Sequence, residues 1–154
     1  MNKPLSKTPI RQGRAGYEVR EVVLHCAAIN TGQFGNLTPT QIRAEIDSWH
    51  RARGFTNGFG YHGFFMPDGS FHTGRPFNQI GAHVVERNRG TLGFLMIESR
   101  KITKVGRFED WFTEAQRVSV KTIIATLPGI RWVTGHNDYA KKLCPGFKDR
   151  KSVV

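Results

Sequence analysis

The sequence predicts a single α/β domain, in which helices flank a central mixed β-sheet. Three observations support this prediction. The chain has 154 residues, which suits one domain. Apolar, β-branched runs alternate with segments of helical periodicity, a pattern that implies a sheet with helices packed on its faces. The 17 glycines supply many turns, and folding a chain of this length buries roughly 70% of its unfolded surface, enough for a core without disulfides.

The first predicted elements are a strand and a helix. Residues 20–27 alternate in polarity and then run apolar with β-branched valines, which is typical of a buried strand. Thr38 is a candidate N-cap, with Pro39 at the first helical position and Gln41 placed for a capping box. Gly54 marks the end of this helix. The apolar positions that follow helical spacing are Ile42, Ile46 and Trp49.

A hairpin and a second buried strand are expected next. Residues 61–66 and 70–74 flank Pro67-Asp68-Gly69. This triplet favours a turn, because proline fixes φ, aspartate bonds to its own backbone and glycine accepts a positive φ. Residues 92–97 form an apolar run of strand length.

The last third of the chain predicts a helix followed by a final strand. Thr113 begins the helix and Pro128-Gly129 ends it. Residues 130–134 form the last strand and lead into a loop that carries His136. The helix positions expected to face the core are Ala115, Val118, Ile123 and Leu127.

The chain divides into a short basic arm and one folded domain. Residues 1–18 are polar, basic and rich in Gly and Pro, whereas residues 19–154 carry the predicted elements. No apolar stretch follows the basic residues 1–7, so a signal peptide is not expected, and no run approaches the length of a membrane span. We therefore expect a soluble protein that is synthesised in the cytoplasm, and we also expect it to be a monomer.

The net charge is +11, from 23 basic and 12 acidic residues. Such a charge favours anionic partners, such as nucleic acid or the acidic polymers of a cell envelope. An ordinary solvated surface is the alternative interpretation. Most aromatic residues fall in apolar, strand-like runs, so core packing explains them better than stacking on single-stranded nucleic acid.

His136 and Cys144, eight residues apart in a segment punctuated by Gly and Pro, are candidate metal ligands. His25, at the end of the first strand, is a third candidate, and three protein ligands leave the fourth position of a catalytic zinc open for water. Spacing alone leaves other interpretations open, because lone cysteines are often buried hydrophobes and Cys26 could pair with Cys144 as a disulfide. Since strand side chains alternate, Cys26 is expected in the core, on the face opposite His25.

Six short segments carry a family resemblance. In chain order they are residues 23–28, Gly60-Tyr61-His62, Pro67-Asp68-Gly69, Gly74-Arg75-Pro76, Gly81-Ala82-His83, and the stretch from Gly135-His136 to Cys144-Pro145-Gly146-Phe147. Together they resemble the zinc-dependent N-acetylmuramoyl-L-alanine amidases related to peptidoglycan recognition proteins, and within that family the phage amidase-type lysozymes, or endolysins. The resemblance covers roughly residues 21–147 and implies the same mixed sheet with flanking helices.

The resemblance also implies roles for particular residues. It implies that Zn²⁺ is bound by His25, His136 and Cys144. Tyr61 matches a tyrosine that lies beside the zinc and is needed for activity, although it could instead be a strand tyrosine packed on the sheet. Lys142 matches a lysine proposed to stabilise the oxyanion of the tetrahedral intermediate, a role open to a preorganised cation.

Two further positions concern the substrate groove. A separate feature, on the central strand, departs from the family pattern. His83 and Arg75 match residues that line or support the groove, so we expect them to bind substrate. Some relatives carry a glutamate on the central strand as a general base, but residues 93–97 are all apolar or glycine here. Glu98, just after this strand, is an alternative base.

The sequence therefore predicts a zinc hydrolase that cleaves the amide between N-acetylmuramic acid and L-alanine in peptidoglycan. It would act as an endolysin, a bacteriolytic enzyme that reaches the cell wall when the host lyses. One alternative is a non-catalytic peptidoglycan-binding module, although relatives that only bind have generally lost the cysteine ligand. The other is an amidase that also binds and regulates a phage RNA polymerase.

Overall fold

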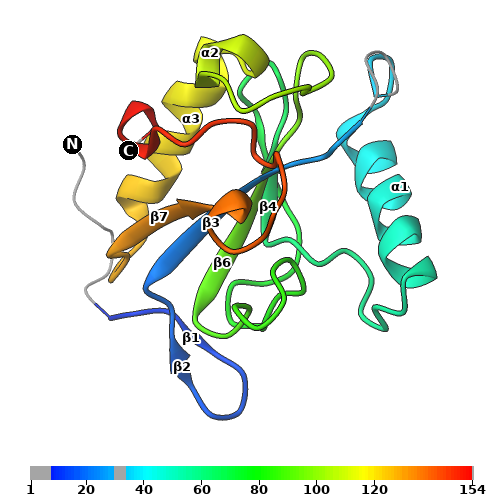
Figure 1. The fold of residues 1–154 in the computed structure, drawn as a ribbon. Helices are drawn as coiled ribbons and strands as arrows, with labels where there is room; N and C mark the ends of the chain where they lie inside the picture. The colour runs from blue at the N-terminus through cyan, green and yellow to red at the C-terminus, as the bar shows by residue number, and fades with distance from the viewer. Residues whose placement is uncertain (1–7, 30–33, 154) are drawn as a thin grey trace.

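A five-stranded mixed sheet forms the centre of the molecule (Figure 1). The computed structural model describes residues 8–29 and 34–153. The strand order is β5-β4-β6-β3-β7; β5 is antiparallel to β4, and the other pairs are parallel. This sheet, with helices on its faces, confirms the predicted fold class. The strands are β3 (Glu21–Cys26), β4 (Gly63–Phe65), β5 (Phe71–Thr73), β6 (Thr91–Met96) and β7 (Trp132–Gly135).

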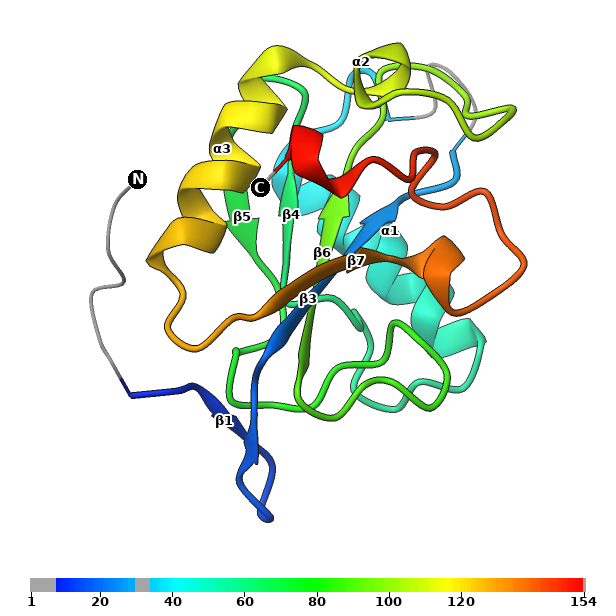
Figure 2. The same cartoon turned by 60° about the vertical axis from the view of Figure 1, so that its left-hand side comes forward.

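Helices α1 and α3 lie on opposite sides of this sheet (Figures 1 and 2). Helix α1 spans Pro39–Ala52, α3 spans Glu114–Thr126, and the short α2 spans Phe108–Trp111. Two separate hydrophobic clusters fill the layers, one on each face of the sheet. No helix in the described part of the chain is long and apolar enough to cross a membrane.

The predicted helix starts are confirmed by their caps. The Thr38 side chain accepts from the backbone N–H of Gln41, and the Gln41 side chain accepts from the Thr38 N–H. Thr113 and Gln116 form the same capping box at the start of α3. Each box satisfies two backbone donors that would otherwise lack partners.

The predicted buried face of α3 was wrong at two positions. Val118 is 56% exposed, Ala115 is also exposed, and the buried positions are Gln116 and Val120. The Gln116 amide donates to the carbonyl oxygens of Phe65 and Ile97, so a polar side chain occupies the interface with the sheet. Helical periodicity of apolar residues could not reveal this hydrogen-bonded glutamine.

Part of the predicted N-terminal arm folds against the domain. Strands β1 (Arg11–Gln12) and β2 (Tyr17–Glu18) form an antiparallel hairpin. The fully buried Gln12 side chain donates to the carbonyl of Thr91 and accepts from the N–H of Gly90. Residues 1–7 lie outside the described part.

Candidate metal centre and its pocket

Strand register places His25 beside His136. Strand β3 pairs in parallel with β7, and Leu24 lies opposite Gly135. The next residue on each strand is a histidine, and the centroids of the two imidazole rings are 4.9 Å apart. His136 begins a short 3₁₀ turn, His136–Asp138, where β7 ends. Side-chain alternation in β3 directs Leu24 and Cys26 into the cluster on the α3 side and leaves His25 on the opposite face, as predicted.

Cys144 reaches the same place from the C-terminal segment. Its Sγ accepts a hydrogen bond from the backbone N–H of Cys26 at 3.2 Å and lies 3.9 Å from Nδ1 of His25. The indole N–H of Trp111 donates to the carbonyl of Gly146 and helps to hold the segment against the domain. Cys144 and Cys26 are both free thiols, so the possible disulfide does not form.

His25, His136 and Cys144 form the only three-residue group suited to a metal ion among the described residues. One potential ligand atom from each residue lies within 4.8 Å of the other two. Two imidazoles and one thiolate match the ligand types that Zn²⁺ prefers, and three ligands leave a tetrahedral position open. Cys26 is not a member of this group.

A buried hydrogen-bond chain orients the His25 imidazole. The Thr91 hydroxyl donates to backbone carbonyls, so its oxygen accepts from Nε2–H of His83 at 3.1 Å. Nδ1 of His83 is then unprotonated and accepts from Nε2–H of His25 at 3.0 Å. His25 therefore keeps its Nδ1 lone pair free, and this is the atom that lies near Cys144.

The sheet makes room for the His83 ring at Gly93 on β6. A Cβ atom at position 93 would lie 2.5 Å from Cγ of His83, far inside contact distance. The backbone N–H groups of His83 and Val84 both donate to the Asn88 side chain, which fixes the loop that carries the imidazole. A glycine in a central strand thus allows a histidine to lie flat against the sheet.

Burial and hydrogen bonding favour the protonation states that a zinc site needs. Burial lowers the pKa of His25 and holds that of His83 well below its usual value, so both imidazoles are neutral near pH 7. Hydrogen bonding with the Cys26 side chain, and then the neighbouring imidazoles of His136 and His25, hold the pKa of Cys144 well below its usual value although burial opposes this shift. A neutral imidazole and a thiolate are the forms that bind metal.

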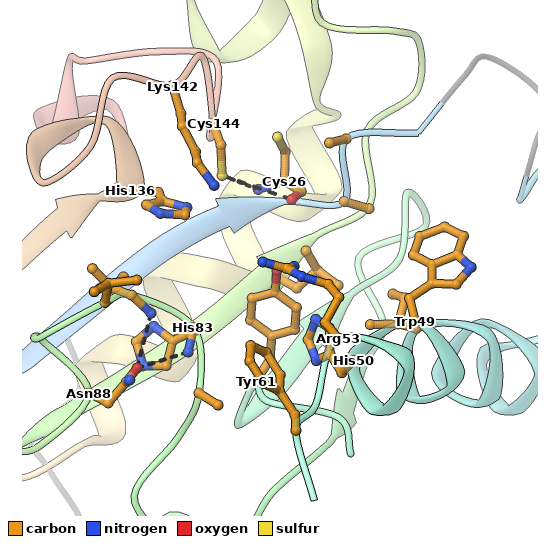
Figure 3. Close-up of a pocket in the computed structure, with 18 residues that line it drawn as sticks. Cys26, Trp49, His50, Arg53, Tyr61, His83, Asn88, His136, Lys142 and Cys144 are labelled. Atoms are coloured by element: carbon orange, nitrogen blue, oxygen red, sulfur yellow. Dashed lines mark hydrogen bonds between the residues drawn. The ribbon is translucent and has the colours of Figure 1, made fainter. Parts of the chain in front are cut away.

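Two of the candidate ligands, His136 and Cys144, line a pocket of about 390 Å³ (Figure 3), and the fully buried His25 lies against them. Tyr61 packs edge-on against His25, with ring centroids 5.0 Å apart. Burial raises the pKa of Tyr61, so its phenol remains protonated at neutral pH. Figure 3 shows the Lys142 side chain directed into the pocket beside His136 and Cys144.

Helix α1 and the loop after it form the opposite wall of the pocket. His50 is buried, and its Nδ1 accepts the N–H of Gly60, so this histidine helps to fix the backbone that leads to Tyr61. Arg53 lines the pocket, as Tyr61 does, and its guanidinium lies over the Phe55 ring, 5.4 Å from the ring centroid. No feature of the sequence distinguishes Arg53 from the many other basic residues.

Arg75 does not line the pocket. Its guanidinium donates to the backbone carbonyls of Phe59, Ile80 and Gly58. These three hydrogen bonds hold together the loops around the pocket. The structure therefore brings His83 to the candidate metal ligand His25, whereas Arg75 is not among the residues that line the pocket.

Glu98 has a structural position beside the ligands. Its carboxylate accepts from the N–H groups of Ala27 and Ala28, which follow β3, and burial raises its pKa. Ala27 and Ala28 line the pocket. Glu98 thus fixes the backbone that follows His25.

A second buried carboxylate connects the segments that carry the histidines. Glu21 is 4% exposed; it forms an ion pair with Arg87 at 2.7 Å and accepts from the hydroxyls of Tyr139 and Thr134. Arg87 belongs to the loop after His83, and Tyr139 directly follows the 3₁₀ turn of His136. This network could not be predicted from sequence, because its members are up to 118 residues apart.

Comparison with known proteins places the chain in a family. It is 30% identical over 129 residues to the endolysin of Enterobacteria phage T3, and the match covers 82% of this chain and 80% of that protein. The chain belongs to the phage endolysin family. The endolysin of Escherichia phage T7 is 29% identical over the same shares of the two chains. No protein-family model matches this endolysin.

Solved structures with the same fold include amidases and recognition proteins. The N-acetylmuramoyl-L-alanine amidase LysC from Clostridium intestinale has a TM-score of 0.69 and 24% identity, over 97% of this endolysin and 93% of LysC. Drosophila peptidoglycan recognition protein LB has a TM-score of 0.68 and 20% identity, over 94% and 82% of the respective chains. These likenesses confirm the fold that the family resemblance implied.

Proposed function

We propose that this endolysin is a zinc-dependent N-acetylmuramoyl-L-alanine amidase that cleaves peptidoglycan. The observation that carries the proposal is the convergence of His25, His136 and Cys144, of which His136 and Cys144 line an open pocket. Family membership supports a cell-wall substrate, and a structural neighbour is an amidase by name. The enzyme would reach the wall when the host lyses.

His25, His136 and Cys144 would hold the ion through Nδ1 of His25, an imidazole nitrogen of His136 and the Cys144 thiolate. When bound, Zn²⁺ would act as a Lewis acid toward the scissile carbonyl and lower the pKa of a bound water. His83 is assigned to positioning His25 rather than to substrate, because both of its ring nitrogens already have partners. Arg75 is assigned to supporting the pocket loops for the same reason.

Tyr61 is proposed to orient the attacking water and assist proton movement. Its ring contacts His25, and its phenol is protonated at neutral pH, so it can donate a hydrogen bond at the reacting centre. Lys142 is proposed to stabilise the oxyanion. Its ammonium group enters the pocket on the side where His136 and Cys144 lie, and a cation fixed there favours the negative charge that develops on the carbonyl oxygen.

Mass spectrometry of the fragments released from purified peptidoglycan tests the proposed reaction. An amidase releases stem peptides with a free L-alanine amino terminus and leaves intact glycan strands whose N-acetylmuramic acid residues carry free lactyl carboxylates. Release of disaccharide-peptides would instead indicate a glycosidase. If the protein sediments with peptidoglycan but releases no fragment when loaded with zinc, it is a binding module and the proposal is wrong.

A further inference from the structure

Most of the net positive charge is concentrated in two segments. Residues 100–107 contain four basic and no acidic residues, and residues 141–151 contain five basic and one acidic residue. Together these 19 residues carry a net charge of +8, out of +11 for the whole chain. We call these two segments the basic rim.

The two segments of the basic rim lie side by side in the fold, although they are about 40 residues apart in sequence. The N–H of Gly106 donates to the carbonyl of Gly146 at 2.8 Å, and Gly106 forms a parallel bridge with Phe147. Figure 2 shows the loop before α2 and the C-terminal segment adjacent to one another at the top of the molecule. The charges therefore gather on one surface.

Nearby carboxylates offset only part of this charge. Glu109 lies 3.9 Å from Arg107, Asp110 accepts from the Arg107 N–H, and Asp138 pairs with Arg150. If these three carboxylates are counted with the rim, its net charge is still +5. Lys104 and Lys148 are exposed, and no carboxylate of the described residues lies within ion-pair distance of either.

The basic rim extends from a surface hollow to the catalytic pocket. Arg100, Lys101 and Lys104, together with Thr103, Asp110 and Trp111, line an open hollow of about 370 Å³. Lys142, from the other half of the rim, points into the pocket that holds the candidate ligands. A polymer bound along the rim would lie next to the site of hydrolysis.

The side chains of the rim indicate what kind of anion it binds. The aromatic residues next to it, Phe108, Trp111, Phe112 and Phe147, are all at most 5% exposed, so no aromatic face is offered for stacking on bases. Val105 and Leu143 are only 43% and 44% exposed and are not accompanied by an aromatic anchor for a bilayer. Lysines are two-thirds of the basic residues of the rim. Each presents a compact positive charge, which attracts a phosphate group without requiring a particular geometry.

We infer that the basic rim is a docking surface for a poly(polyol phosphate) polymer of the cell envelope. Binding there would hold the enzyme close to the wall and raise its local concentration at the substrate. This role rests on the proposed function, but the binding itself requires no catalysis and is measured separately.

The test uses the full-length protein and a defined probe, fluorescent poly(glycerol phosphate), with anisotropy as the readout. The rim variant is Lys104→Gln/Arg107→Gln/Lys148→Gln, and the matched control is Arg14→Gln/Lys121→Gln/Arg131→Gln, which removes three exposed charges elsewhere. At 50 mM NaCl the rim variant should bind the probe at least about tenfold more weakly than wild type, and the control variant less than about threefold more weakly. The wild-type affinity should decrease as the salt concentration increases.

Equal losses in the two variants, or no binding by wild type, would overturn the proposal. So would tighter binding of an oligothymidylate with the same number of phosphates, or of phosphatidylglycerol vesicles, because either would identify a different partner. None of the substituted residues belongs to the candidate site, so all proteins should cleave a soluble muropeptide at the same rate. Absence of that cleavage in wild type would contradict the proposed function while leaving the binding result intact.

Discussion

Nε2 of His25 lies 3.0 Å from Nδ1 of His83, and both imidazoles are buried. Because Thr91 fixes the protonated nitrogen of His83, this contact determines which nitrogen of His25 is available for a metal. An imidazole held in one tautomer and one orientation is a better ligand than one that must be ordered on binding.

We predict that His83→Ala weakens zinc affinity by about 10- to 100-fold, the range found when a hydrogen-bond partner of a ligating histidine is lost. Competition with a chelator of known affinity measures the change. His72→Ala, which removes a histidine on the hairpin outside the pocket, is the control and should retain wild-type affinity. Unchanged affinity in His83→Ala would show that the contact does not orient His25.

Tyr61→Phe and Lys142→Met should retain zinc and lose rate by about 10²-fold or more, because each removes a group assigned to the transition state. The loss should appear equally in kcat and kcat/KM. Tyr17→Phe is the matched control for Tyr61→Phe, and Lys141→Met, next to Lys142 in sequence, is the control for Lys142→Met. Both control side chains are exposed. A variant with near-wild-type kcat would exclude that residue from catalysis, and a variant without zinc would assign it to the metal site.

Glu21→Gln should destabilise the fold by about 1–3 kcal/mol, because it leaves the ion pair and hydroxyl contacts of a buried carboxylate incompletely satisfied. Urea unfolding measures the difference. Tyr139→Phe should couple to it in a double-mutant cycle, since the two side chains are in direct contact. Additive effects would show that the network does not act as a unit. The exposed Glu114→Gln is the control and should stay within about 0.5 kcal/mol of wild type.

Protonation of His62 should contribute to acid unfolding. Burial lowers its pKa to about 4, and its Nδ1 accepts the N–H of Gly93, so the folded state requires the neutral imidazole. The folded pKa is below the unperturbed value of 6.5. The stabilisation is therefore complete above pH 6.5 and is lost as the pH falls toward 4, by about 3 kcal/mol in total. His62→Gln should be less stable at pH 7 but should lose less stability over this range, and parallel stability curves would contradict the assignment.

Local sequence features predicted the elements, and tertiary contacts determined the rest. The caps at Thr38 and Thr113 and the strand ending at His25 could be identified because their signals lie within a few residues. The parallel pairing that aligns Leu24 with Gly135 explains why two histidines after apolar runs meet at one edge of the sheet. Sequence could not locate the Thr91–His83–His25 chain, since it depends on the space that Gly93 leaves on a neighbouring strand.

The most direct test of the metal centre compares the two cysteines. Cys144→Ala and Cys26→Ala each remove one thiol. The two cysteines are neighbours in space, but only Cys144 belongs to the candidate ligand group. Zinc content and amidase activity should be measured for both variants after chelation and zinc addition. We predict about one zinc per chain and restored activity in wild type and Cys26→Ala, with loss of both in Cys144→Ala. Full zinc occupancy and wild-type turnover in Cys144→Ala would contradict it.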